Sequence, residues 1–250
     1  FRTWGPPREA FRPDAEDGAP DTQLQQLAVS LYAGTYVGFL TLFRISRYVL
    51  QPGAIDEGTQ VDTTQLITSR DGLHWHRVAD RQPFLEPAPS GFGATGYRLA
   101  PHLLVHGDEV RLYLSSNCRR GGRWSGLEIG MATLERDRFV AFVPERMRET
   151  ALVELEPCEY GRAPLRLNAT VGRAGWVRPE LADMSGNAVP GFTRDDAVAL
   201  AGDAADHPLQ WRKGDRAVGL EGLPAGARGR PLRLRLWFEQ ASIFALGVGV

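Results

Sequence analysis

Two similar hairpin patterns lie 73 residues apart, and this spacing restricts the fold more than any other feature of the sequence. The segment TQLQQLAVSLYAGTYVGFLTLFR predicts strands over 25–31 and 36–43, joined by a turn that contains Gly34. The segment YRLAPHLLVHGDEVRLYLSS predicts a second hairpin, with Gly107 in its turn and a strand over 110–114. Glycine in each turn supplies the positive φ that a tight hairpin needs.

Two further matches support a repeat. Trp4 and Trp75, each followed by an apolar segment that contains proline, lie 71 residues apart. Asp71 in LITSRDGLHW and Asp137 in MATLERDRFV lie 66 residues apart. Spacings of this size indicate a repeated unit of four short strands, which is typical of a β-propeller. The alternative is a generic β-sandwich in which the matches are coincidental.

The rest of the chain is also predicted to be all-β. Its apolar runs are short, are broken by Gly, Pro, Asp and Asn, and show almost no helical periodicity. The repeat stops near residue 148, and alternating leucines around 165–167 and 232–236 then indicate a β-sandwich. The sequence therefore predicts a partial β-propeller over 1–148 and a β-sandwich over 149–250.

Charge and cysteine content restrict the function. The net charge is −1, from 29 basic and 30 acidic residues, which gives no electrostatic reason to expect nucleic acid or a membrane surface as partner. No apolar run reaches the roughly 18 residues of a membrane span. Two cysteines, Cys118 and Cys158, form neither a disulfide framework nor a metal cluster, and whether they pair is left open. We expect no cofactor and no metal.

The stretch SRDGLHWHR is compatible with a metal site, a general base or a turn. His74 and His76 lie two residues apart, so on a strand both imidazoles share one face. Two histidines without a third ligand make a poor zinc site. On the repeat, the stretch is the turn between the third and fourth strands, in which Asp71 bonds turn amides and Gly72 is left-handed. Trp75 is then expected to pack between neighbouring blades.

Three acidic clusters have simpler interpretations. AEDG over 15–18 and RDDA over 194–197 are interpreted as solvated loops. AGDAADH over 201–207 could bind a cation, but its oxygen ligands are too sparse for a calcium loop.

The order of motifs resembles a known group of proteins. S-x-D-G-x-x-W, RDRFVAF, LRLNA, VRPEL and PGF follow one another as in bacterial proteins related to the five-bladed-propeller glycoside hydrolases, the invertase, levansucrase and arabinanase superfamily, with a C-terminal β-sandwich. The resemblance covers nearly the whole chain and implies a sugar-acting fold with carboxylates on the inner strands of different blades. Since such a ring needs about five four-stranded units, it also implies that further blades precede Phe1.

Propeller geometry selects the candidate site. Residues that begin an inner strand or end a second strand have access to the central pocket, and these are Asp21, Gln23, Arg44, Tyr97, Arg98 and Asn117. Asp21 is the candidate catalytic carboxylate, as a general base, a transition-state stabiliser or a modulator of another acid. Its alternative role is that of a turn residue after Pro20. The other five are candidate substrate-binding residues, since arginine orients carboxylates or binds hydroxyls and tyrosine stacks on sugar rings.

The expected function is that of a carbohydrate-active protein of glycoside-hydrolase type. It would hydrolyse O-glycosidic bonds with paired carboxylates, part of the site lying upstream of this fragment. The expected partners are an oligosaccharide or glycoside and the N-terminal blades of the same protein. The alternatives are a non-catalytic carbohydrate-binding or interaction module, and a fragment that does not fold stably alone. The compartment, cytoplasmic or exported, is left open.

Overall fold

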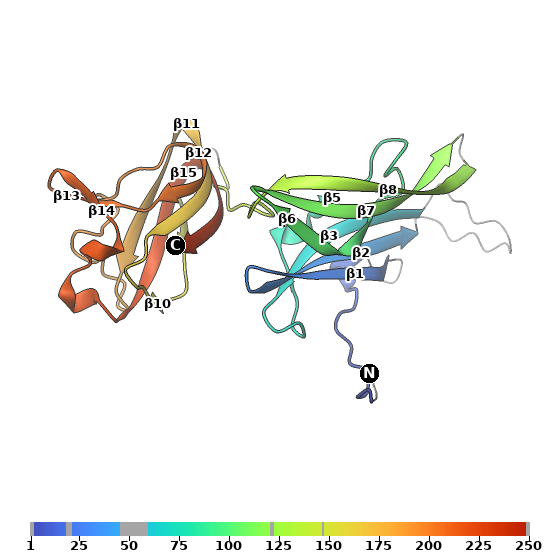
Figure 1. The fold of residues 1–250 in the computed structure, drawn as a ribbon, viewed down its shortest axis with the longest axis horizontal. Helices are drawn as coiled ribbons and strands as arrows, with labels where there is room; N and C mark the ends of the chain where they lie inside the picture. The colour runs from blue at the N-terminus through green and yellow to red at the C-terminus, as the bar shows by residue number, and fades with distance from the viewer. Residues whose placement is uncertain (1–2, 19–21, 46–59, 121–122, 147, 249–250) are drawn as a thin grey trace. The chain divides into compact units, whose positions relative to one another are not determined.

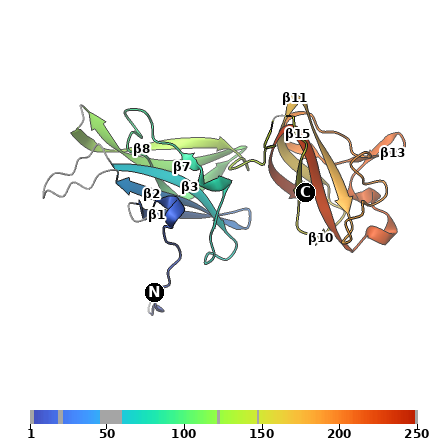
Figure 2. The same ribbon diagram turned by 180° about the vertical axis from the view of Figure 1, so that it is seen from behind.

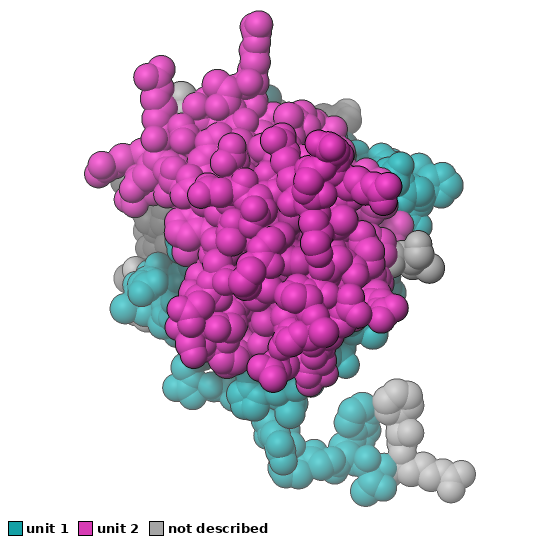
Figure 3. Space-filling model, turned by 90° about the vertical axis from the view of Figure 1, so that its left-hand side faces the viewer, with its two compact units in different colours: residues 1–135 teal, residues 136–250 magenta. Residues whose placement is uncertain are grey.

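The computed structural model describes residues 3–18, 22–45, 60–120, 123–146 and 148–248 (Figure 1). The chain is all-β with several antiparallel sheets, and its described helices are short 3-10 turns, which confirms the all-β part of the prediction. None of these helices has the length and apolar character of a membrane span. The chain divides into two compact units, 1–135 and 136–250 (Figure 3), whereas the sequence suggested a boundary after 148.

The first sheet of unit 1 is an antiparallel meander (Figure 1). Its strands are β1 (Thr22–Tyr32), β2 (Thr35–Ile45) and β3 (Gln60–Ser69), with the short β4 (His76–Arg77) and β5 (Pro83–Leu85) both paired to β3. Ala33 and Gly34 form the β1–β2 turn, both with positive φ. The first predicted hairpin is therefore confirmed.

The second sheet contains β6 (Arg98–His106), β7 (Glu109–Arg120) and β8 (Arg123–Glu135). The expected fourth strand is absent from this sheet in the described part of the chain. Phe142 forms a bridge with Ile243 of unit 2 instead. Arg138 stacks on Phe244 and donates to Asn168 at 2.9 Å, and these contacts hold the segment on unit 2.

The two sheets of unit 1 meet along β1 and β6. Gln26 Nε2 donates to the Leu99 carbonyl at 3.1 Å, and the Leu103 amide donates to Ser30 Oγ at 3.1 Å. Each of these bonds joins residues that are 73 apart in sequence. The spacing of the repeat therefore has a structural meaning, because corresponding positions of the two sheets are in contact.

A buried ion-pair cluster attaches the N-terminal segment to the first sheet. Asp17, at the end of η1 (Ala15–Asp17), has a fully buried carboxylate. It accepts from Arg77 Nη2 at 2.5 Å and from Arg81 Nη1 at 3.3 Å. The interpretation of AEDG as a solvated loop is wrong for Asp17, because two arginines that follow β3 compensate its burial.

Unit 2 is built around two long strands, visible from both sides in Figures 1 and 2. β11 (Leu165–Ala182) and β15 (Pro231–Val248) pair along most of their length. β12 (Gly202–Pro208) pairs with β11, while β9 (Ala151–Glu154) and β10 (Cys158–Glu159) pair with β15. The smaller elements are β13 (Trp211–Lys213), β14 (Arg216–Val218), η4 (Leu220–Gly222) and η5 (Ala225–Ala227).

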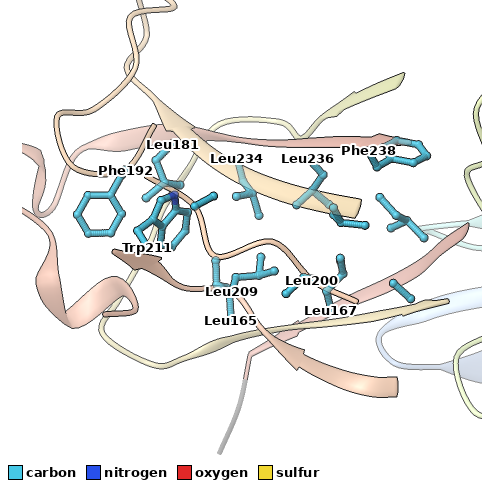
Figure 4. Close-up of a cluster of buried hydrophobic side chains, with 14 of the residues drawn as sticks. Leu165, Leu167, Leu181, Phe192, Leu200, Leu209, Trp211, Leu234, Leu236 and Phe238 are labelled. Carbon is cyan, nitrogen blue, oxygen red and sulfur yellow. The ribbon is translucent and has the colours of Figure 1, made fainter. Parts of the chain in front are cut away.

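The core of unit 2 follows from the alternation of leucines. Leu232, Leu234 and Leu236 are buried because successive even positions of β15 face the same side. They pack with Phe192 and Trp211 in a continuous apolar cluster (Figure 4). The leucine strands predicted from the sequence lie within β11 and β15.

Candidate functional site

A β-bulge in β1 creates the polar side of a pocket in unit 1. Leu24 pairs with Leu42 and Gln26 pairs with Thr41, so Gln25 is an extra residue in β1. The bulge lets two consecutive glutamines reach β6. Gln25 Oε1 accepts from Arg98 Nη2 at 3.1 Å, and Gln26 Nε2 donates to the Leu99 carbonyl.

Arg98 connects three strands of unit 1. It opens β6, bonds Gln25 of β1, and donates through Nε to Asp62 Oδ2 of β3 at 3.0 Å. The backbone supports this contact, since the Asp62 amide donates to the Thr95 carbonyl at 2.9 Å. Gly96 has a φ of +88°, and a Cβ there would lie 1.8 Å from the Asp62 carbonyl oxygen. Only glycine fits this close approach.

Asp62 is a buried carboxyl beside a half-exposed guanidinium. Its side chain is 9% exposed and that of Arg98 is 44% exposed. Asp62 Oδ1 is buried without a hydrogen-bond partner among the described residues. Burial raises the pKa of Asp62 above its ordinary value, and the bond and charge of Arg98 only partly oppose this.

The pocket beside this cluster has a volume of about 550 Å³ and is lined by residues of both sheets of unit 1. Its lining consists of Gln25, Gln26, Arg98, Leu99, Ala100, Tyr113, Leu114, Ser115 and Ile129. The lining offers amide, guanidinium and hydroxyl groups next to an aromatic ring, and none of these described residues is acidic. Such a surface suits a polar, uncharged ligand with several hydroxyls.

Of the predicted site residues, Arg98 lines the pocket. Gln23 and Arg44 lie at the same end of the first sheet, where Arg44 pairs with Thr22 and Val61, but neither is part of the lining. Gln23 Oε1 accepts from Gln25 Nε2 at 3.5 Å. Asp21 lies outside the described residues.

Tyr97 and Asn117 support the loop over 91–96 instead of lining the pocket. The Tyr97 ring packs on Phe92, with ring centroids 5.8 Å apart. The Asn117 carbonyl accepts from Thr95 Oγ1 at 3.0 Å. Both residues therefore act on the pocket through the backbone that leads into β6.

Sequence reasoning missed Gln25, Gln26, Asp62 and Tyr113. The string QLQQ contained a signal, because two adjacent glutamines interrupt the alternation of a strand and indicate a bulge. Tyr113 alternates with the buried Leu112 and Leu114, which predicts its outward face. Asp62 has no comparable local signal, since its importance depends on Arg98, 36 residues away.

The histidine stretch is a structural turn. Asp71 Oδ1 accepts from the amides of Leu73 and His74, both at 2.8 Å, and Gly72 has a φ of 74°. The predicted turn is confirmed. Trp75 packs on a face of the first sheet, where a Cβ on Gly38 would lie 2.8 Å from its ring, and its position between blades stays a prediction.

The described residues contain no group of three or more histidine, cysteine or acidic side chains arranged to hold a metal. In the segment 201–207, Asp203 bonds Arg138 and Thr170, while His207 Nε2 lies 3.1 Å from the Ala169 carbonyl. Cys158 is an exposed free thiol.

Comparisons with known proteins give weak likeness at most. No protein-family model matches the sequence, and no curated protein matches it. Among solved structures, the chain is similar to a glycoside hydrolase family 43 arabinoxylan arabinofuranohydrolase from Bacillus subtilis, determined in complex with cellotetraose. The identity is 9% and the TM-score 0.27, over 90% of this chain and 53% of that one. The chain thus spans about half the length of that structure.

Proposed function

We propose that this chain is a carbohydrate-active protein and that the pocket in unit 1 binds a neutral sugar unit of an oligosaccharide. The observation that carries the proposal is the bulge-built cluster of Gln25, Gln26 and Arg98 at a pocket edged by Tyr113. Planar amide and guanidinium groups match pairs of neighbouring hydroxyls, and an aromatic ring packs on the apolar face of a sugar.

The contacts of Arg98 favour a neutral ligand. Asp62 and Gln25 engage Nε and Nη2, which fixes the plane of the guanidinium. Nη1 has no partner among the described residues and remains for a ligand oxygen. Because the Asp62 carboxylate offsets the charge of Arg98, the pocket has little reason to select an acidic sugar.

The scaffold in this proposal is a partial five-bladed-type propeller in unit 1, with a β-sandwich in unit 2. The hydrogen bonds between β1 and β6, which join residues 71 or 73 apart in sequence, support adjacent blades with neighbouring inner strands.

The second and more specific part of the proposal is that the protein hydrolyses O-glycosidic bonds. It needs an acid and a second carboxylate on the two sides of the scissile bond. Asp21 remains the proposed catalytic carboxylate. Asp62 does not line the pocket, and its role in the proposal is to position Arg98.

The binding test uses isothermal titration calorimetry of the protein with a panel of neutral oligosaccharides and uronic-acid oligosaccharides. We expect a neutral member to bind, and Tyr113→Ala and Gln26→Ala each to weaken binding about tenfold. Arg216→Ala, on the exposed β14 of unit 2, is the matched control and should bind as the wild type does. Unchanged binding by Tyr113→Ala would exclude this pocket as the sugar site.

The hydrolysis test uses aryl glycosides and the oligosaccharides that bind. We expect Asp21→Asn to bind but not to hydrolyse. The enzyme in this test is the full-length protein, and binding without hydrolysis by that protein would identify a non-catalytic carbohydrate-binding module. Full hydrolysis by Asp21→Asn would show that Asp21 is not the catalytic carboxylate.

A further inference from the structure

Unit 2 contains a second pocket, of about 600 Å³, between the loop that follows β11 and the segment that leads into β15. Its walls are mainly apolar and include Val189, Pro190, Pro224 and Leu232. Met184 and Arg230 also line it, and both are exposed. This volume lies within the range of sites that enclose small organic ligands.

The loop over 183–187 that forms one side of the pocket is preorganised. The Asp183 carboxylate accepts from the amides of Ser185 and Asn187, both at 2.9 Å. Arg235 Nη1 donates to the Gly186 carbonyl at 3.1 Å. These bonds fix the loop without a ligand, so binding would not have to order it.

Arg230 differs from the neighbouring arginines of the segment 228–235. Arg228 donates to the Leu223 carbonyl, while Arg233 and Arg235 both donate to Glu154. Arg230 makes no such bond with the residues that the structure describes. A guanidinium whose N–H donors are available beside an apolar cavity can bind a carboxylate or sulfonate. The apolar part of such a ligand would fill the cavity.

Asp183 does not cancel this preference. Its carboxylate oxygens accept from N–H donors of its own loop, and these include the side-chain Nδ2 of Asn187 at 3.3 Å. Its negative charge is therefore already solvated by the protein.

We propose that this pocket binds a small aromatic carboxylate, with the ring against the proline and aliphatic walls and the carboxylate on Arg230. The inference concerns unit 2 alone and does not depend on the sugar pocket of unit 1.

The test is a titration of the whole chain with 2-naphthoate, followed by NMR of ¹³C-methyl methionine. Met184 reports on the pocket, and Met131 of β8 is an exposed internal control in unit 1. Met184→Leu assigns the signal by its loss. We expect a saturable shift of Met184 and none of Met131. No shift of Met184, or equal shifts of both, would overturn the proposal.

A second arm tests the role of charge. We expect Arg230→Gln to weaken 2-naphthoate binding about tenfold or more, since the bond lost is charge-assisted. The neutral analogue 2-naphthylmethanol should bind the wild type and Arg230→Gln equally weakly. Arg216→Gln is the matched control and should not change binding. Equal affinity of wild type and Arg230→Gln for 2-naphthoate would contradict the assignment of Arg230.

Discussion

Asp62 and Arg98 form the contact on which the unit 1 pocket depends at the scale of single residues. Asp62 stays in place because Gly96 allows its backbone to approach the loop before β6. Arg98 depends on Asp62 in turn, since the carboxylate bonds Nε and fixes the guanidinium beside Gln25. Burial raises the pKa of Asp62 and the ion pair with Arg98 lowers it, and burial is the larger effect.

The raised pKa of Asp62 predicts that the free energy of unfolding depends on pH. The folded-state pKa of Asp62 lies above its ordinary value of 3.8, so its contribution to stability is fully present below that value and is lost as the pH rises through the folded pKa. We expect the free energy of unfolding of the wild type, relative to Asp62→Asn, to fall as the pH rises above about 4. Urea unfolding at a series of pH values measures the difference.

Arg98→Gln is the second variant in this experiment. Without the guanidinium, the pKa of Asp62 should rise further, which ¹³C NMR of the carboxyl group can follow during titration. A wild type that gains stability over Asp62→Asn with rising pH would show that Arg98 outweighs burial, contrary to our account.

At the scale of elements, the turn between β3 and β4 depends on one carboxylate. Asp71 accepts from the backbone and the ring of His74 and from the backbone of Leu73, and these bonds hold its pKa well below its usual range. A lowered pKa contributes stability above the unfolded value of about 3.8, and this contribution is lost as the pH falls through the folded pKa.

We therefore expect Asp71→Ala to destabilise unit 1 at neutral pH and to approach the wild type in stability in strong acid. Urea unfolding of both proteins as a function of pH measures this convergence. Asp108→Ala, in the β6–β7 turn, is the matched control, since no capping bond of its carboxylate is found among the described residues. A destabilisation by Asp71→Ala that is constant down to strong acid would contradict the role of the carboxylate charge.

Individual elements were largely predictable from the sequence, whereas their local irregularities were not. Alternation and turn glycines located the β1–β2 hairpin because both signals are local. The bulge at Gln25 depends on how β1 aligns with β2, and QLQQ is compatible with more than one register. Asp62 became part of the site only through pairing with a residue on another sheet. The candidate list therefore contained Arg98 but not its partners.

At the scale of the whole molecule, the repeat spacing of 73 residues recurs in the hydrogen bonds between β1 and β6, whereas the boundary between the units depends on contacts that are distant in sequence. Phe142 pairs with Ile243, about 100 residues later in the chain, and no local pattern near 136–148 encodes that choice. The cores of the two units are separate in sequence. The unit 2 core spans β11 to β15. Unit 1 presents Tyr113, Ile129 and Met131 on the exposed face of β7 and β8.

The separate cores of the two units, and the exposed apolar side chains of unit 1, predict that the units unfold separately and that unit 2 is the more stable. Differential scanning calorimetry of the chain should show two transitions. Trp211→Ala should lower only the upper one, at a cost of roughly 3–5 kcal/mol, because it removes the centre of the unit 2 core. Leu112→Ala, buried in β7, should lower only the lower transition by a destabilisation of about 2–5 kcal/mol. A single transition that both substitutions shift would mean that the units fold as one cooperative body.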